Sequence, residues 1–494
     1  MAEGGPVSGT GVLRRGVLAG SAAAVALAVA ACGRTSAAGA AASGPVNSVT
    51  AFGAKGDGST DDAAAVQQAI DHATASGGQV TFPPGKYFLG KGLTAGAPIR
   101  LSGEAGQGGC TLEFASTVPV CLSLGQSTNK PPFPGPRLEL CGLGFHYGGT
   151  GSVVHIDESK VNPVWQDTLI ERCLFYVSGG GVAVQSINQR STIITMCSFF
   201  GSNSGVGVQL TDTDNAKIID NVFYNLNYGI QGVRGPQRVF DAGCLIVGND
   251  LYGATNGLHF SYWELVQAIG NIIDGCDIPM NLNDCYHSII DGNYLGGYGS
   301  GPVLNIYTTN GSPGEIVVRG NYLNNYQSKS GATASVQIAG ADSGTPVQYL
   351  ALVGNVINGY PTYGIHLKNT SHCSVRDNML VQGGGTLSLA IYDSTPGDAR
   401  IEGNDVPHNS ISAKGDVLRY NRGYETEAAG SVTLPAGQSS VHVPLSLAVA
   451  PEWVTATPTA NVGAVWVTGI SASGFDVHVA APSAGVAVLW RAGA

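Results

Sequence analysis

The chain has 494 residues, of which 72 are glycine and only 12% are charged, and its formal net charge is −10. A glycine-rich, charge-poor chain is typical of a turn-rich β architecture and argues against a disordered or mainly helical protein. No basic stripe is present to neutralise phosphates, which argues against a nucleic-acid partner. An anionic substrate would need a local group of Arg or Lys side chains.

The first residues are predicted to be a targeting segment. Arg14-Arg15 precedes an apolar run, Ala22 to Ala31, that is too short for a typical membrane span. The paired arginines resemble a twin-arginine export signal, and the Val-Ala-Ala-Cys sequence ending at Cys32 resembles a lipobox. We expect an export signal over residues 1–31 and a flexible tether over residues 32–44. The protein is then secreted or held at the cell surface, meeting a membrane only through a lipid anchor at Cys32; an ordinary signal peptide with a chance cysteine is the alternative.

Residues 46–90 contain three short sequence signatures: FGAKGDG from Phe52, TDD from Thr60 and FPPG from Phe82. Between the last two, apolar residues at helical spacing predict a helix from Ala63 to Ala75. Thr60 or Asp61 can cap this helix, and the Gly-Gly pair at 77–78 can close it. We interpret the carboxylates of this stretch, Asp57, Asp61 and Asp62, as helix-capping groups and not as a metal site.

From about residue 95 to residue 425, short strands alternate with turns around a recurring Asn. Gly or Asp precedes each Asn and a short strand follows it; successive Asn residues are 22 to 34 positions apart, at 221, 249, 271, 293, 321, 355, 378 and 404. Cys173 and Cys197 hold the same place upstream. A fixed repeat with occasional insertions predicts a solenoid, and Asn side chains can hydrogen-bond to one another along such a stack.

We therefore predict an all-β fold, with a parallel β-helix of three sheets and about ten or more coils over residues 45–425. Helical periodicity is absent over most of this region, so no crossover helices are available to build another kind of parallel sheet. The nine cysteines after Cys32 are predicted to be buried core thiols. A disulfide between Cys276 and Cys285 is the alternative.

The signatures around Phe52, Thr60 and Phe82 resemble the N-terminal signature of the pectate-lyase superfamily of right-handed parallel β-helices. That superfamily includes polygalacturonases, β-1,3-glucanases and phage tailspike depolymerases. The resemblance implies a right-handed β-helix whose open N-terminal end is covered by the helix.

Residues 426–494 are predicted to form a small C-terminal β module. Five short alternating runs, starting at Ser431, Trp453, Ala464, Gly474 and Ala487, suggest a sandwich. The module resembles those that follow tailspike-like β-helices, which trimerise or bind. A structural or adhesive role is expected because it contains no acid/base cluster.

One outer face of the β-helix is predicted to be rich in hydrogen-bonding groups. In the recurring Gly-apolar-x-apolar strands the x side chains should point outward. They are Gln185, Gln209, Gln231, His259, Ser261, Asn281, Asn283, Asn305, Tyr307, Gln337, His366 and Lys368. Neutral amides and aromatic rings suit carbohydrate hydroxyls and ring faces, so we predict a polysaccharide or oligosaccharide partner. The alternative is that any exposed sheet must be polar outside.

Candidate catalytic residues lie on the turns beside that row. We predict Asp212, Asp214, Asp241 and Glu264, with His259, as catalytic residues, because carboxylates one or two coils apart can meet at glycosidase separation. The predicted substrate-binding residues are Gln209, Gln231, Arg234, Tyr262, Trp263 and Asn281. Asp284, Tyr286 and His287 follow the next strand. Each carboxylate could instead be a simple turn-former.

An elimination mechanism is the alternative to hydrolysis. It would use Arg234, Arg238, His259 and Tyr262 beside a uronate carboxyl group, and calcium would be needed only in such a lyase. No metal site or cofactor is otherwise predicted. The polygalacturonase groups are absent, apart from Asp-Thr-Asp at 212–214 and the isolated His259, so no catalytic residue transfers from that family. Inulin fructotransferases, also exported β-helices, offer a comparison in which Glu264 would be the acid.

Three functions remain open from the sequence. The first is an exported enzyme that cleaves a polysaccharide by hydrolysis, elimination or fructan transfer. The second is a non-catalytic carbohydrate-binding or adhesion protein. The third is a tailspike-like homotrimer with its site between subunits.

Overall fold

The computed structural model describes residues 46–494, with gaps. The gaps are residues 77, 107, 126–137, 158–166, 237–240, 312–313, 326–332, 342–343, 360–361, 382–388, 396–397, 408–409, 414–415 and 481–483. The predicted export signal, tether and lipidated Cys32 lie outside the described residues. Among the described residues, no helix is long and apolar enough to cross a membrane.

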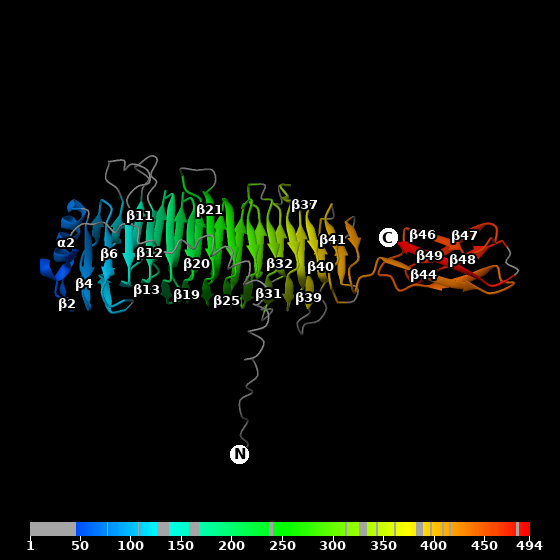
Figure 1. The fold of residues 1–494 in the computed structure, drawn as a ribbon, viewed down its shortest axis with the longest axis horizontal. Coiled ribbons are helices and arrows are strands. Elements are labelled where there is room, and N and C mark those ends of the chain that lie inside the picture. Colours follow the sequence, from blue (N-terminus) through cyan, green and yellow to red (C-terminus); the bar gives the residue numbers. More distant parts are fainter. Residues whose placement is uncertain are drawn as a thin grey trace, which may run out of the picture.

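The molecule is an elongated solenoid with a helix at one end and a small β module at the other (Figure 1). Three long parallel sheets run the length of the solenoid, which confirms the predicted β-helix of three sheets and more than ten coils. Sheet A has fifteen strands, and sheets B and C have thirteen each. The chain visits A, B and C in turn, so each coil contributes one strand to each sheet over most of the length.

The strand bounds follow the three sheets. Sheet A contains β1 (Val46–Ser48), β3 (Gln79–Phe82), β6 (Arg100–Gly103), β9 (Leu138–Cys141), β12 (Asp167–Glu171), β15 (Ser191–Thr195), β18 (Ala216–Ile219), β21 (Asp241–Val247), β24 (Trp263–Ile269), β27 (Ile289–Asp291), β30 (Val317–Arg319), β34 (Ala351–Val353), β38 (Ser374–Arg376), β41 (Arg400–Glu402) and β43 (Val417–Arg419). Sheet B contains β2 (Asp57–Asp61), β4 (Gly85–Leu89), β7 (Cys110–Phe114), β10 (Gly144–Tyr147), β13 (Leu174–Val177), β16 (Ser198–Gly201), β19 (Val222–Tyr224), β22 (Asp250–Tyr252), β25 (Ile272–Cys276), β28 (Tyr294–Gly297), β31 (Tyr322–Asn325), β35 (Val356–Asn358) and β39 (Met379–Val381). Sheet C contains β5 (Leu93–Ala95), β8 (Val120–Leu124), β11 (Ser152–Asp157), β14 (Val182–Ile187), β17 (Val206–Thr211), β20 (Tyr228–Val233), β23 (Asn256–Ser261), β26 (Ile278–Asn283), β29 (Leu304–Tyr307), β32 (Ala334–Ala339), β36 (Tyr363–Lys368), β40 (Leu389–Asp393) and β42 (Ile411–Ala413). A separate pair is formed by β33 (Val347–Gln348) and β37 (Thr370–Ser371).

The recurring Asn residues form a continuous hydrogen-bonded ladder inside the turn between sheets A and B. Each Oδ1 accepts both the backbone N–H and the amide N–H of the preceding Asn; Asn271, for example, donates both to Asn293 at 2.9 Å. Each amide also donates to a carbonyl of the coil below, as Asn293 does to Ala268. Asn421, which the sequence pattern did not include, is the ninth and last member. Cys197 caps the other end through its backbone N–H.

The residue before each ladder Asn, and not the Asn itself, has the left-handed backbone conformation. Asp220 has φ 54° and Gly292 has φ 63°, and the same sign recurs along the column. Only a few residue types adopt this conformation without strain, mainly Gly, Asn and Asp. This explains why Gly or Asp precedes the Asn, which leaves the Asn amide free to turn inward.

The interior is apolar and tightly stacked. Phe145, Phe175, Phe199 and Phe223 stack in consecutive coils with ring centroids 4.6 to 4.9 Å apart. The nine described cysteines are free, and eight of them are buried, as predicted. The alternative disulfide between Cys276 and Cys285 is wrong, because both are buried free thiols.

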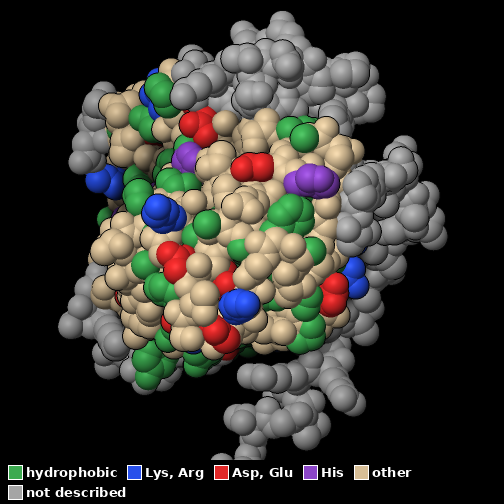
Figure 2. All heavy atoms as spheres, turned by 90° about the vertical axis from the view of Figure 1, so that its left-hand side faces the viewer, with side chains coloured by type: hydrophobic (Ala, Val, Ile, Leu, Met, Phe, Trp, Pro, Cys, Tyr) green, Lys and Arg blue, Asp and Glu red, His purple; other side chains and the backbone are tan. Residues whose placement is uncertain are grey.

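The N-terminal end is covered by α2 (Ala63–Ser76), next to the short 3-10 turn η2 (Val49–Phe52). The predicted capping role is confirmed for Asp61, whose Oδ1 accepts the Ala63 N–H at 3.1 Å. It is wrong for Asp57 and Asp62, which bind backbone N–H groups outside the helix; Asp57 accepts those of Ser59 and Thr60. Both oxygens of Asp62 accept backbone N–H groups of the 55–56 turn. Seen from this end, acidic, basic and apolar side chains are interspersed on the surface (Figure 2).

The C-terminal module consists of two three-stranded antiparallel sheets with a core of their own, which includes Phe475 and Val488. One sheet contains β44 (Glu427–Leu434), β49 (Val486–Gly493) and β46 (Trp453–Pro458); the other contains β45 (Ser440–Pro444), β48 (Gly474–Val479) and β47 (Val465–Ser471). The sequence predicted five strands here. It missed β45, which is short and ends at a proline.

Candidate functional site on the outer face of sheet C

The predicted outer row on sheet C is confirmed by the strand register. From β14 to β36 the aligned positions are Gln185, Gln209, Gln231, His259, Asn281, Asn305, Gln337 and His366. Neighbouring members are one coil apart, roughly 4.8 Å. His155 and Tyr392 extend the row at its two ends. The face is therefore a straight polar track along the solenoid.

The side chains of this row hydrogen-bond to one another in two runs of opposite direction. From the N-terminal side, Gln185 donates to Gln209 at 2.8 Å, and Gln209 donates to Gln231 at 2.9 Å. From the C-terminal side, Asn305 donates to Asn281 at 3.1 Å, and the Asn281 amide donates to Nδ1 of His259 at 3.1 Å. Both runs point their N–H groups toward the His259 coil. His259 is therefore the place where the direction of the track reverses.

His259 is a neutral imidazole in this setting. Burial lowers its pKa from the ordinary histidine value, and an amide donor at Nδ1 also opposes protonation there. Because Nδ1 accepts, the ring proton is on Nε2, which lies 3.4 Å from the Ser261 hydroxyl. The edge of the Tyr228 ring packs against the imidazole with centroids 5.5 Å apart. His259 thus offers a substrate a hydrogen-bond donor and no charge.

Tyr262 lies three residues further on, in the turn that leaves sheet C. Its backbone is left-handed, with φ 60°. The Arg234 guanidinium from the coil below lies 4.9 Å from the Tyr262 ring centroid, and the Asn310 amide from two coils above donates to the Tyr262 hydroxyl at 3.3 Å. A cation, a phenol and an amide from three different coils therefore meet in the turn that follows the His259 strand. Arg234 and Tyr262 were among the residues predicted from the sequence, whereas Tyr228 and Asn310 were not.

Asp284 positions the turn that carries Asn310. Its side chain is buried and accepts hydrogen bonds from the Thr309 hydroxyl at 2.7 Å, the Gly311 N–H at 2.8 Å and the Thr308 hydroxyl. Although burial by itself raises the pKa of this carboxyl, these hydrogen bonds bring it below the usual aspartate value. We conclude that Asp284 is a structural carboxylate and not an acid or base.

The predicted carboxylate pair is not assembled by the described residues. Asp212 is fully buried, and a Cβ on Gly235 would lie only 2.0 Å from its carboxylate, so the next coil covers it. Asp214 is 8% exposed and forms an ion pair with Arg190. Glu264 is partly exposed at the start of β24. The backbone of Asp241 pairs with that of Trp263, but the Asp241 side chain and Arg238 lie outside the described residues.

Trp263 was predicted to contact substrate, and this expectation is wrong. Its side chain is completely buried and packs edge-on against Phe260, with centroids 5.3 Å apart. The turn at Tyr262 directs the next side chain inward. Gln209, Gln231 and Asn281 do lie on the track, although Asn281 is only 8% exposed.

Comparisons with known proteins agree with this architecture. The family model described as rhamnogalacturonase A/epimerase, pectate lyase-like, matches residues 46–134. The A-module of the Azotobacter vinelandii mannuronan C-5 epimerase AlgE6 is 18% identical with a TM-score of 0.54, covering 75% of this chain and 99% of its own. The Yersinia enterocolitica family 28 exopolygalacturonase is 11% identical with a TM-score of 0.51, covering 77% and 79%. Tailspike protein 3 of bacteriophage CBA120 is 16% identical with a TM-score of 0.52, covering 76% and 59%.

No curated protein matches the chain. The family model matches only the N-terminal part of the chain, and the solved structures show that the chain has the parallel β-helix fold. At these identities the solved structures establish the fold, so chemistry has to be argued from the residues of the site.

Proposed function

We propose that the protein binds an acidic polysaccharide along sheet C and cleaves it by elimination at the coil of His259 and Tyr262. The observation that carries this proposal is the group formed by Arg234, Tyr262 and Asn310 in the turn that follows the His259 strand. A carboxylate-bearing sugar needs a local cation in a chain of net charge −10, and Arg234 supplies one. Two of the fold neighbours, an epimerase and an exopolygalacturonase, are named for acting on sugar polymers, which supports a carbohydrate substrate.

Elimination fits the available side chains better than hydrolysis. A glycosidase needs two accessible carboxyl groups on either side of the bond. Asp212 is buried and Asp214 is held by Arg190, which leaves Glu264 among the described candidates. Elimination requires no carboxylate pair. It requires a group that neutralises the substrate carboxylate and a group that moves one proton.

The proposed step uses groups already in place. Arg234 pairs with the uronate carboxylate, and His259 Nε2–H donates a hydrogen bond to the bound sugar. The Tyr262 phenol oxygen takes the proton from the carbon next to the carboxyl group. The electron pair of that carbon–hydrogen bond forms a carbon–carbon double bond as the bond to the glycosidic oxygen breaks. The Tyr262 hydroxyl gives its proton to the leaving oxygen.

This proposal assigns to Arg234 the role that calcium would have in a calcium-dependent lyase. Within the part of the chain that the structure describes, no three or more His, Cys, Asp or Glu side chains are grouped so as to hold a metal ion. A lyase that used calcium would bring it to the substrate carboxylate, and here Arg234 takes that role.

The test is incubation with polygalacturonate, alginate and other uronate polymers, following both reducing ends and the ultraviolet absorbance of unsaturated uronates. We expect both signals to rise together and the Tyr262→Phe variant to lose both. Tyr349→Phe is the control, because Tyr349 is another tyrosine with left-handed backbone, is exposed and lies away from sheet C. Reducing ends without the absorbance would establish hydrolysis or transfer instead, and retarded migration in a polymer gel without either signal would establish binding alone.

Non-catalytic binding is the second candidate, and the hydrogen bonds within the track favour it. The side-chain amides of Gln185, Gln209 and Asn281 already donate hydrogen bonds to neighbouring side chains of the track. A surface of this kind can hold an extended glycan without reacting with it. The two candidates differ only in whether Tyr262 is needed for a product.

Location and assembly are also proposals. We propose export through residues 1–31 and lipidation at Cys32, tested by radiolabelled fatty acid incorporation with Cys32→Ala as the control. A homotrimer, which the fold likeness to a tailspike protein supports, is tested by sedimentation equilibrium of the purified protein.

A further inference from the structure

The inner Asn ladder ends at Asn421 with hydrogen-bond donors that every earlier coil satisfies. Asn404, one coil below, gives its backbone N–H and its amide N–H to Asn421 Oδ1 at 3.0 and 2.9 Å. Asn421 is 2% exposed, and its own amide donates once, to the Ile401 carbonyl at 2.8 Å. Among the described residues, nothing accepts its backbone N–H or its second amide hydrogen. Two convergent donors therefore face the place where the next Asn oxygen would be.

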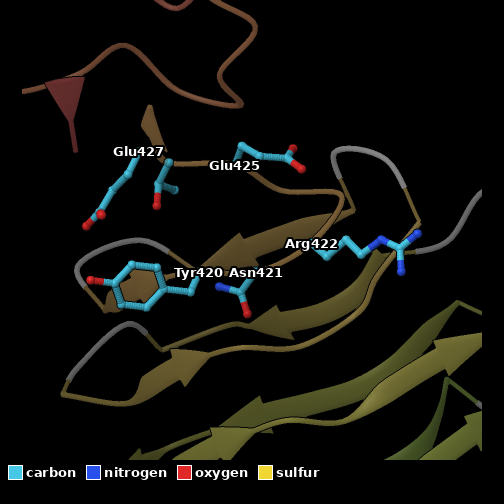
Figure 3. A pocket seen from close by; sticks show the side chains of 6 residues that line it. Tyr420, Asn421, Arg422, Glu425 and Glu427 are labelled. Atoms are coloured by element: carbon cyan, nitrogen blue, oxygen red, sulfur yellow. The ribbon is translucent and has the colours of Figure 1, made fainter. Parts of the chain in front are cut away.

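A cavity of about 320 Å³ lies at this end of the ladder, with Asn421 in its lining. Tyr420, Asn421 and Arg422 line it from the last coil; Glu425, Thr426 and Glu427 line it from the segment leading into β44. Figure 3 shows these two groups facing each other across the cavity. The apolar core beside it is covered separately, because Ala448 and Val449 pack against the core that includes Tyr424.

We propose that this cavity binds the acetamido group of an N-acetylated amino sugar. The missing ladder member would supply a carboxamide oxygen, and an acetamido group carries the same C(=O)–N unit. Its carbonyl oxygen would accept both Asn421 donors, as each ladder oxygen does. Leaving two buried donors without an acceptor is costly, so a ligand that satisfies them gains specificity as well as affinity.

The charges around the cavity select a neutral oxygen over a carboxylate. Glu425 and Glu427 both line the cavity. Glu427 is paired with Arg491 at 3.4 Å, so Glu425 is the carboxylate that would repel an anionic ligand. Arg422 does not compensate, since its side chain is 83% exposed and paired with Asp405 at 3.3 Å. The two glutamates suit the N–H of an acetamido group, which is a hydrogen-bond donor. The cavity is thus chemically distinct from the group formed by Arg234, Tyr262 and Asn310 beside sheet C.

Tyr420 provides a surface for the sugar ring. Its side chain is 70% exposed, and its backbone has the left-handed conformation found before every ladder Asn, with φ 54°. In most other coils Gly or Asp holds this position. An exposed phenol at the rim of a polar cavity can pack against the C–H face of a pyranose.

The experiment is isothermal titration of the full-length protein with N,N′,N″-triacetylchitotriose and, as the matched control, cellotriose. The two trisaccharides differ in the acetamido groups alone. We expect saturable binding of triacetylchitotriose, with cellotriose at least about tenfold weaker. Tyr420→Ala should weaken binding of triacetylchitotriose by about tenfold, whereas Tyr349→Ala, which removes another exposed left-handed tyrosine, should leave it unchanged.

Circular dichroism and thermal unfolding of both variants establish that they are folded. No saturable binding of triacetylchitotriose would overturn the proposal. Equal affinity for cellotriose would also overturn it, as would equal losses in the two tyrosine variants. None of these results bears on Tyr262, because the elimination assay uses a different ligand and a different surface.

Discussion

The inner Asn ladder and the outer track on sheet C use the same chemistry in two environments. In both, amide side chains from consecutive coils hydrogen-bond to one another at about the same distances, as in Asn271 to Asn293 at 2.9 Å and Gln209 to Gln231 at 2.9 Å. The ladder members are at most 2% exposed and run in one direction from end to end. The outer members are mostly part-exposed, and their direction reverses at His259.

The difference between the two rows distinguishes amides that stabilise the fold from amides that can bind a ligand. A buried amide with no partner has no water to replace the lost bond, so each ladder member is held by its neighbours. An outer amide can exchange its neighbour for water or for a sugar hydroxyl at little cost. The same residue type is therefore scaffold inside and a binding surface outside.

The largest effect is expected from Asn293→Ala in the ladder. The substitution removes the acceptor of two Asn271 donors. It also removes the amide that donates to the Ala268 carbonyl and one of the two donors to Asn321 Oδ1, which keeps the backbone N–H of residue 293. We expect the free energy of unfolding to fall by about 3 kcal/mol or more. Urea unfolding followed by circular dichroism measures it, and a loss below about 1 kcal/mol would contradict the scaffold role.

A smaller effect is expected from Asp284→Asn, which tests how the scaffold supports the track. An amide places N–H groups against the donors of Thr309 and Gly311, which now share a carboxylate. We expect a loss of about 2 kcal/mol of stability and loss of the Asn310–Tyr262 contact. Because hydrogen bonding lowers the pKa of Asp284, its ionised carboxylate stabilises the folded state at pH values above the ordinary aspartate pKa. This stabilisation is lost as the pH falls through the lowered pKa.

Asn310→Ala is the companion variant for that test. If Asp284 acts through the turn, both variants should slow the polysaccharide reaction to a similar extent, while Asn310→Ala should be stable. If Asp284→Asn reacted as fast as the wild type, the turn held by Asp284 would not contribute to the reaction.

A pH-dependent effect is expected at the last coils, where the buried Asp393 lies close to Asp416. Burial, followed by the neighbouring Asp416 charge, raises the pKa of Asp393 to about 7. The folded state therefore holds this proton more tightly than the unfolded chain does, and stability falls as pH rises from about 4 to about 7. We expect a loss of about 2 kcal/mol across that window. Asp393→Asn should remove the slope, which thermal unfolding at several pH values would measure.

The smallest effect on stability is expected from Gln209→Ala on the track. Its amide bonds are part-exposed, so water replaces them, and the free energy of unfolding should change by about 0.5 kcal/mol or less. Binding of the polysaccharide should weaken several-fold, as affinity electrophoresis can measure. A loss of stability as large as that of Asn293→Ala would contradict the claim that the outer row contributes little to the stability of the fold.

The fold and the track could be predicted from the sequence because both depend on a repeat. The Asn spacing sets the coils, and the Gly-apolar-x-apolar strands set which side chains point outward, so Gln209, His259 and Asn305 could be aligned in advance. The preference for Gly or Asp before each Asn came from the backbone at that position, a detail that the spacing alone did not reveal.

The details of the site could not be predicted, because they depend on turns between strands. Asp212, Tyr262 and Asp284 all have left-handed backbone after sheet C, and whether the next side chain points out or in follows from that turn. This is why Trp263 is buried. Asn310 donates to Tyr262 although the two residues are 48 positions apart in the sequence. Because the loops between these coils vary in length, no local sequence pattern predicts this contact.

The most direct test of the account is the initial rate at which wild-type protein and Tyr262→Phe form unsaturated uronates from the uronate polymer that the wild type cleaves fastest. The account predicts a loss of at least about a hundredfold in the variant, with the same thermal unfolding temperature as the wild type. An unchanged rate would show that the chemistry lies elsewhere on the β-helix.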